Sequence, residues 1–306
     1  MAQKLTNVAL LALPALPLAG AWGSMGHYTI AYIATSFVSS DTQAYFQDLL
    51  GDTSSDYLAN VATWADSWRY TDEGGFSKPF HYIDAMDDPP SSCDVDFERD
   101  CPEEGCIVSA IANYTNIMLT PSESTASLEV AAKMLVHFLG DIGQPLHCEN
   151  LELGGNGIDV TYDGEDTNLH SVWDSDIPES ITDGSSQSVA RTWASSLVSA
   201  IETGGYADLA GDWVEGMDVT ESQDQAMIWA TESNEYVCTA VLVDGVQHVE
   251  STDLAGDYTD DAQPVVKVQV AKQGYRLAKW LDGIVEELSK GKGRSKCKPR
   301  GKGEEF

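Results

Sequence analysis

Apolar residues recur at helical spacing along most of this chain, and this periodicity constrains the fold more than any other feature. Segments with apolar side chains at three- and four-residue intervals are typical of helices that bury one face. They cover residues 27–37, 42–50, 54–68, 107–119, 127–141, 187–203, 222–243 and 262–288. Residues 158–162 are the best candidate for a strand. We therefore expect a mainly α-helical fold.

No internal repeat and no linker rich in Pro, Gly or Ser divides residues 22–289, so they are expected to form a single helical domain. Pro121-Ser-Glu-Ser and Asp260-Asp-Ala-Gln-Pro are typical helix starts, and Gly143-Gln-Pro predicts a helix end. The long connections, residues 84–106 and 148–170, are acidic loops. Long loops on a helical scaffold often carry function.

The first 21 residues have the pattern of a secretory signal peptide. Lys4 precedes an apolar stretch, residues 8–18, and Ala19-Gly20-Ala21 has small residues where a signal peptidase cleaves. The apolar stretch is too short to span a membrane as a helix. We therefore expect a secreted protein whose mature chain begins at Trp22.

Charge is strongly unbalanced, with 49 acidic and 17 basic residues in 306. Residues 22–289 hold nine basic and 47 acidic residues, a formal charge of −38. This excludes binding of nucleic acid through a basic surface, which needs many Lys and Arg contacts to phosphates. An enzyme acting on phosphate esters would need metal ions for its positive charge. Residues 290–306 are basic, Gly-rich and aperiodic, and we expect a disordered tail.

Export makes the six cysteines disulfide candidates, because oxidising compartments preserve such bonds. They are Cys93, Cys101, Cys106, Cys148, Cys238 and Cys297, and they allow 15 complete pairings. Asn113-Tyr-Thr is the one N-glycosylation sequon.

Two histidines have an aspartate four residues further on, His137 before Asp141 and His170 before Asp174. On a helix this spacing places both side chains on one face, where they can bind a common atom. Either pair alone is more typical of a solvated helical ion pair.

The surroundings of His137 favour a metal site. His137, Asp141 and His147 lie within 11 residues, and His137 is in the apolar run Met-Leu-Val-His-Phe-Leu. Burying an unpaired imidazole and carboxylate is costly, and coordination of a metal removes that cost. Histidine and carboxylate ligands without thiolates suit zinc best, with manganese second. A hydrogen-bonded polar cluster in the core is the alternative.

Two further segments carry candidate ligands. Asp66 lies between Trp64 and Trp68 with Arg69 three residues later, which also fits a helical salt bridge. His81 follows Pro79 in an extended segment, where a single histidine is more often structural.

Together these motifs resemble the trinuclear-zinc, single-strand-specific nuclease family of fungi and plants. The resemblance covers residues 22 to about 288 and rests on several motifs in the same order. They are Trp22-Gly-x-x-Gly-His27, Trp-Ala-Asp66, Phe-His81-Tyr-Ile-Asp84, His137-x3-Asp141-x5-His147 and His170-x3-Asp174.

The resemblance implies three zinc ions per chain and a cleft built around them, in a fold similar to zinc phospholipase C. One zinc would take Asp66, His81, His137 and Asp141, and a second would take His147, His170 and Asp174. A third would take His27, the bridging carboxylate of Asp141, and the amino group and carbonyl of Trp22. An α-amine ligand exists only after residue 21 has been removed.

The resemblance also implies the substrate contacts. Arg69 and Asn156 would contact the scissile phosphate and would be catalytic together with Asp66. Tyr82, a position where Phe would also be acceptable, would stack on a base, and Asp84 would hydrogen-bond that base's edge. Disulfides Cys93–Cys238 and Cys101–Cys106 match those of the family, which leaves Cys148 and Cys297 over.

The implied activity is hydrolysis of single-stranded DNA and RNA to products with 5′-phosphate ends, together with 3′-nucleotidase activity, by a monomer that needs no membrane or protein partner. Paired zinc ions can activate a water for attack on phosphorus and stabilise the leaving 3′-oxygen. Stacking on an aromatic ring needs an unpaired base, which explains preference for single strands.

Two other functions are alternatives to single-strand-specific nuclease activity. Bacterial zinc phospholipase C also uses an N-terminal Trp, but its first His lies further from that Trp and its last ligand is Glu. A non-catalytic zinc-binding protein would leave Arg69, Asn156, Tyr82 and Asp84 without a role.

Overall fold

The computed structural model describes residues 22–182 and 184–296, which are mainly helical as the periodicity predicts. The helices are α1 (Ser24–Phe37), α2 (Ser40–Leu50), α3 (Trp64–Trp68), α4 (Phe97–Asp100), α5 (Ile107–Leu119), α6 (Thr125–Asp141), α7 (Leu169–Ser171), α8 (Ile177–Thr182), α9 (Gln187–Glu202), α10 (Ser222–Tyr236), α11 (Val246–Ser251) and α12 (Asp257–Lys296). The predicted signal peptide and Cys297 lie outside the described residues. The expected similarity to zinc phospholipase C stays a prediction.

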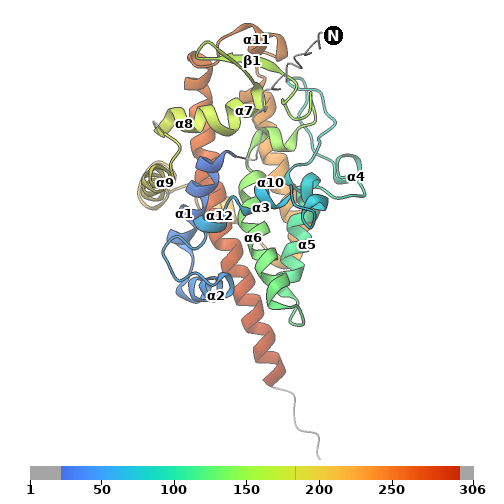
Figure 1. Ribbon diagram of the computed structural model, residues 1–306, viewed down its shortest axis with the longest axis vertical. Coiled ribbons are helices and arrows are strands. Elements are labelled where there is room, and N and C mark those ends of the chain that lie inside the picture. The colour runs from blue at the N-terminus through green and yellow to red at the C-terminus, as the bar shows by residue number, and fades with distance from the viewer. Residues whose placement is uncertain (1–21, 183, 297–306) are drawn as a thin grey trace, which may run out of the picture.

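Helix α12 runs along the long axis of the molecule, and its C-terminal end projects beyond α2 and the α5–α6 turn (Figure 1). It packs against α1, α5, α6 and α9. Gly274 allows α12 to pack closely against α1, because a Cβ at this position would lie only 2.5 Å from Cβ of Ile33. The domain boundary expected after residue 289 falls inside this helix, which continues to Lys296, and residues 297–306 are outside the described residues.

Helix α6 begins and ends where the sequence predicts. The Ser124 side chain accepts a hydrogen bond from the backbone N–H of Ser127, which caps the helix, and the helix ends at Asp141 just before Gly143-Gln-Pro. From residue 134 onward every side chain of α6 is buried. A helix that is buried on all sides normally carries only apolar groups, so His137 and Asp141 need a compensating interaction.

The prediction of one continuous helix over residues 54–68 is wrong. Only the 3₁₀ turn η1 (Ala59–Val61) and the short α3 form there. Side chains of Asp52 and Ser54 accept hydrogen bonds from the backbone N–H groups of Ser54 and Asp56, at 2.8 and 3.2 Å. Such local bonds compete with the helical hydrogen-bond pattern and favour a turn.

The predicted strand is present as one arm of a hairpin. Strand β1 (Asp159–Tyr162) pairs antiparallel with β2 (Glu165–Asn168). The hairpin leads directly into α7 and a π-helical turn, η4 (Val172–Asp176), and the Asn168 side chain caps α7 by accepting from the N–H of Ser171. This segment carries His170 and Asp174.

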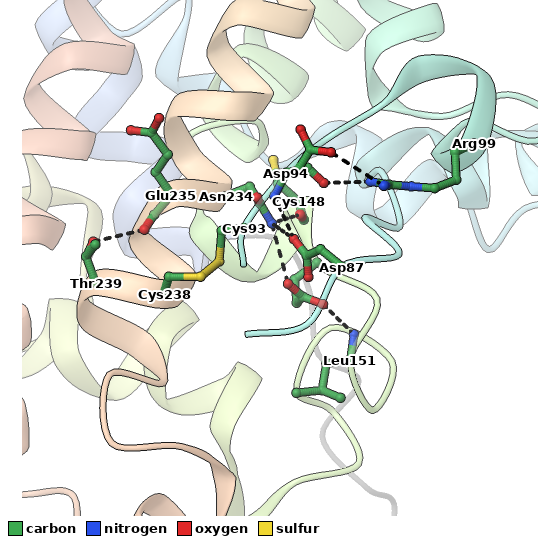
Figure 2. The surroundings of a disulfide bond; sticks show 11 residues. Asp87, Cys93, Asp94, Arg99, Cys148, Leu151, Asn234, Glu235, Cys238 and Thr239 are labelled. Atoms are coloured by element: carbon green, nitrogen blue, oxygen red, sulfur yellow. Dashed lines mark hydrogen bonds and ion pairs between the residues drawn. A yellow bond between two sulfur atoms is a disulfide. The ribbon is translucent and has the colours of Figure 1, made fainter. Parts of the chain in front are cut away.

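Both disulfides expected from the family resemblance are formed, Cys93–Cys238 and Cys101–Cys106. The first joins the long acidic loop to the π-helical turn η7 (Val237–Val241), which directly follows α10, and Figure 2 shows Asn234 and Asp87 beside it. Cys148 is a buried free thiol, and burial raises its pKa.

Two further features concern the surface. Asn113 is exposed on α5, so its side chain is accessible for modification. Within the described ranges, no helix combines the length and the apolar character needed to cross a bilayer.

Candidate metal centre and substrate cleft

The structure brings the predicted ligands together from six separate segments of the chain. Three groups have potential ligand atoms within 4.8 Å of one another. They are His27, His137 and Asp141; Asp66, His81 and His137; and His147, His170 and Asp174.

Asp141 belongs to the first group and also contacts His81 of the second, and its two carboxylate oxygens face different histidines. Oδ1 lies 3.0 Å from Nε2 of His27, whereas Oδ2 lies 3.0 Å from Nδ1 of His81 and 3.1 Å from Nε2 of His137. The carboxylate of Asp141 therefore connects histidines of two different groups.

Helices α1 and α6 must approach closely for His27 to reach this carboxylate. The imidazoles of His27 and His137 stack with their centroids 4.0 Å apart. Gly140 makes the approach possible, because a Cβ at this position would lie 3.0 Å from Nδ1 of His27.

Asp66 joins the centre from α3. Its Oδ1 lies 3.6 Å from Nε2 of His137 and 4.0 Å from Nδ1 of His81. The same oxygen is 3.3 Å from Nη2 of Arg69, so Asp66 forms the predicted salt bridge and also lies within the second group.

The third group is held by the hairpin and by the 3₁₀ turn η3 (Pro145–Cys148). Nε2 of His170 lies 3.1 Å from Oδ2 of Asp174, and Nε2 of His147 lies 3.8 Å from Oδ1. The two imidazoles stack with centroids 5.0 Å apart.

Backbone carbonyls orient three of the histidines. The pairs are Nδ1 of His137 with the Ala62 oxygen at 2.7 Å, Nδ1 of His147 with the His81 oxygen at 2.8 Å, and Nδ1 of His170 with the Gly154 oxygen at 2.6 Å. Since a carbonyl only accepts, each Nδ1 must carry a proton, and each Nε2 faces the cluster. This second layer of hydrogen bonds is typical of metal-ligating histidines.

Several of the predicted ligand atoms are buried without a hydrogen bond. These atoms include Oδ1 of Asp66, Oδ1 of Asp141, Nε2 of His147 and Oδ2 of Asp174. Most buried polar groups in proteins are hydrogen-bonded, so a cluster of exceptions needs an explanation. Metal coordination by this set of imidazoles and carboxylates fits zinc.

The pKa values of these histidines and aspartates show how strongly the groups interact. Burial lowers the pKa of His81 to about 4. Burial also disfavours charge on His137, but the carboxylates of Asp141 and Asp66 prevail and raise its pKa to about 9. For Asp141, burial opposes ionisation, yet His137 and His27 hold its pKa well below the ordinary value.

The first residues that the structure describes lie beside the group of His147, His170 and Asp174. Trp22 is fully buried, and the next residue, Gly23, donates its backbone N–H to the carbonyl oxygen of Asp174 at 2.8 Å. A side chain at Gly23 would collide with Ser175, because its Cβ would lie 2.6 Å from the hydroxyl oxygen. The backbone of residues 22–23 is therefore tightly packed against the π-helical turn η4.

A cleft of about 290 Å³ opens onto the ligands. It is lined by the ligands His81, His147 and His170 and by all four predicted substrate contacts, Arg69, Tyr82, Asp84 and Asn156. The Asn156 amide donates to the Leu153 carbonyl at 2.8 Å, which orients its side chain. Burial and the charge of Asp100 raise the pKa of Asp84.

Sequence reasoning missed Gln144, which holds a ligand in place. Its buried amide Nε2 donates to Oδ1 of Asp174 at 2.6 Å, and its Oε1 accepts from the backbone N–H of Leu146 at 2.5 Å. The available signal was its position before Pro145, where a polar side chain can cap the next turn.

Comparisons with known proteins agree with this site. Residues 22–286 match the family model described as S1/P1 Nuclease. The chain is 52% identical to "Nuclease S1" of Aspergillus oryzae, with 94% of this chain and 99% of that protein covered. It is 44% identical to "Nuclease P1" of Penicillium citrinum (86% and 97% covered) and 32% identical to "Endonuclease 3" of Arabidopsis thaliana (86% and 88% covered). The chain therefore belongs to the S1/P1 nuclease family and is a hydrolase of phosphodiester bonds in nucleic acid.

Proposed function

We propose that this nuclease binds three zinc ions and cleaves single-stranded DNA and RNA to products with 5′-phosphate ends, with 3′-nucleotidase as a second activity. The observation that supports this most strongly is the buried cluster of histidines and aspartates, several of whose atoms lack a hydrogen bond, beside a cleft lined by Arg69, Tyr82, Asp84 and Asn156.

The ligands divide among three zinc positions. The first has Asp66, His81, His137 and Asp141, and the second has His147, His170 and Asp174. The third has His27, Asp141 and the backbone amine and carbonyl of Trp22. Bound zinc would supply Lewis-acid activation of water and positive charge at the phosphate. That charge compensates for the acidic body, which otherwise repels a polyanion.

Arg69 and Asn156 position the scissile phosphate. The Arg69 guanidinium is largely buried, with its Nη2 near Asp66, so its fork of donors is held at the cleft wall. Guanidinium groups bind phosphate oxygens in pairs, and an amide N–H adds a neutral donor. The two residues therefore orient the phosphorus toward the ligand cluster.

Tyr82 and Asp84 select an unpaired nucleotide. The Tyr82 ring is 37% exposed in the cleft, and Asp84 lies two residues further on. Base stacking on an aromatic ring contributes roughly 1–3 kcal/mol per base and tolerates any base, which accounts for activity on both DNA and RNA. A duplex hides the base faces, so double strands are poor substrates.

Residues 1–21 act as a signal peptide in this proposal, residues 22–289 form the nuclease domain, and the protein is a secreted monomer with a glycan on Asn113. Removal of residue 21 creates the α-amine ligand. An N-terminally extended form should therefore bind one zinc fewer, as counted by elemental analysis of the purified protein.

The test is hydrolysis of a 5′-labelled single-stranded oligonucleotide by protein with Trp22 confirmed as its N-terminus. The same sample is measured after chelation and after zinc is restored, and a duplex of the same sequence is run beside it. We expect zinc-restored cleavage of the single strand, with new 5′ ends that a kinase labels only after phosphatase treatment.

Three results would contradict the proposal. Product 5′ ends that a kinase labels directly would mean that the phosphate stays on the 3′ side. Equal rates on duplex and single strand would remove the role of Tyr82. Zinc-loaded protein that cleaves neither DNA nor RNA but cleaves a phospholipid would favour the phospholipase alternative.

A further inference from the structure

A second aromatic and basic surface adjoins the cleft on the segment between Arg69 and Tyr82. Both ends of this segment line the cleft. Between them, Tyr70 is 51% exposed, and Lys78 is exposed on the 3₁₀ segment η2 (Gly75–His81). No predicted ligand or substrate contact uses either residue.

Lys78 is unusual among the cations of this acidic molecule. Seven of the nine basic residues in 22–289 have a carboxylate within 4.0 Å, and Lys267 donates to Gln263. Of these nine residues, all of which the structure describes, Lys78 alone makes no ion pair or hydrogen bond, although Asp72 and Glu73 are exposed on the same segment. Its Nζ instead lies 5.8 Å from the centroid of the Tyr70 ring.

Tyr70 connects Lys78 to the cleft. The guanidinium carbon of Arg69 lies 5.2 Å from the centroid of the same ring. An aromatic face and an ammonium therefore continue directly from the residue proposed to bind the scissile phosphate. This combination of an exposed ring and an unpaired cation is how proteins bind single-stranded nucleic acid.

Packed aromatic rings support the segment between Arg69 and Tyr82. The Trp68 ring stacks on Trp64 and meets Phe76 edge-on at 5.6 Å, and Phe76 meets Phe80 at 5.8 Å. Gly74 packs so tightly that a Cβ would lie 2.0 Å from the Trp68 carbonyl oxygen. A surface held in this way loses little entropy when it binds a ligand.

We propose that Tyr70 and Lys78 form a second nucleotide subsite, which binds the base and phosphate of a single strand next to the nucleotide in the cleft. The Tyr70 ring stacks on the unpaired base, and the Lys78 ammonium moves on its flexible stem to that nucleotide's phosphate. The subsite rests on the proposed nuclease function and makes binding depend on strand length.

The experiment compares a 12-nucleotide single strand with a 3′-mononucleotide, which is too short to reach the subsite. For the mononucleotide, either its KM or its inhibition constant against the 12-mer is measured. Tyr70→Ala should raise KM for the 12-mer about 10-fold, whereas Tyr70→Phe should stay within about 2-fold, because stacking needs only the ring. Neither variant should change the constant for the mononucleotide.

Lys78→Gln tests the phosphate contact through the salt dependence of the affinity for the 12-mer. Each phosphate contact with a single strand contributes about 0.7 to the slope of log affinity against log salt. We expect Lys78→Gln to reduce the slope for the 12-mer by about that amount. Lys290→Gln is the matched control, because it removes one exposed positive charge near the C-terminal end of α12 and should leave the slope unchanged.

The outcomes separate the two proposals. Wild-type protein that fails to cleave the 12-mer overturns the nuclease function itself. An active wild type, with Tyr70→Ala within 2-fold of its KM and Lys78→Gln keeping its salt slope, overturns only the subsite. An equal rise in both the 12-mer and mononucleotide constants also overturns it, because the variants would then act through Arg69 inside the cleft.

Discussion

The two walls of the cleft differ in how firmly their side chains are held. On the metal side, His81, His137 and His147 are at most 3% exposed, and backbone carbonyls fix the Nδ1 atoms of His137 and His147. On the substrate side, Tyr82 is exposed and Asn156 is only partly buried. A metal centre requires ligands at fixed positions, whereas a base can stack on a ring that adjusts. Substitutions on the metal wall should therefore lower kcat, and those on the substrate wall should raise KM.

The sharpest test of the metal wall is Asp141→Asn. This change keeps the side-chain size but removes the charge that faces His27, His81 and His137 together. We expect kcat to fall on the order of 1000-fold or more, with lost zinc, because the charge that stabilises the transition state depends on it. Asp84→Asn, the same chemical change on the other wall, is the control. An Asp141→Asn protein with full zinc content and most of its kcat would show that this carboxylate is not a bridge.

A milder change on the same wall is Gln144→Leu. It removes the 2.6 Å hydrogen bond to Asp174 and leaves the groups around Asp66 and His27 untouched. Loss of such a supporting bond typically costs 10- to 100-fold in metal affinity or activity, and we expect about that loss here. Zinc titration of metal-free protein should show one weakened site. Uniform weakening of all sites would mean that Gln144 supports the fold rather than one ligand.

On the substrate wall, Tyr82→Ala removes the stacking ring. We expect KM for a single-stranded oligonucleotide to rise about 10-fold with kcat changed little, since one stacked base contributes roughly 1–3 kcal/mol. Tyr82→Phe should behave like the wild type. Steady-state kinetics of the three proteins decide this, and a fall in kcat without a change in KM would place Tyr82 with the metal wall.

The smallest expected effect concerns pH and base preference. Because burial and Asp100 raise the pKa of Asp84, its carboxylate gains a proton at a higher pH than an ordinary aspartate as the solution is acidified. The charged acceptor for a base edge is present above that pKa and lost below it. The ratio of kcat/KM between two homopolymers should thus change about 5-fold on acidification, because replacing a charge-assisted hydrogen bond with a neutral one costs about 1 kcal/mol.

Asp84→Asn should have a ratio that does not vary with pH. The ratio is measured within each protein, so loss of zinc at low pH cancels. An identical pH dependence in the variant would rule out Asp84 as the selecting group.

Sequence reasoning succeeded where the relevant contacts are local. The pairs His137–Asp141 and His170–Asp174 follow from helical or near-helical spacing, and both reach 3.1 Å in the structure. The end of α6 and the short strand of the hairpin follow from Gly, Pro and alternation in the same way. The assignment of ligands to groups came from family resemblance rather than from spacing.

Sequence reasoning failed where side chains from distant segments or local polar bonds decide the outcome. The periodic stretch 54–68 broke into turns because Asp52 and Ser54 bind backbone N–H groups. Gln144 was overlooked because its partner, Asp174, lies 30 residues further along the chain.

By itself the sequence determined that the chain is mainly helical, that its body is acidic, and that His137 and Asp141 share one face of a buried helix. Helical period and charge depend only on neighbouring residues, so they can be read without a fold. Only the tertiary structure decided that His27 stacks on His137, that Asp141 faces three histidines, and that Tyr70 and Lys78 extend from Arg69. These contacts depend on close packing between distant segments, as at Gly140, and no local pattern encodes such distances.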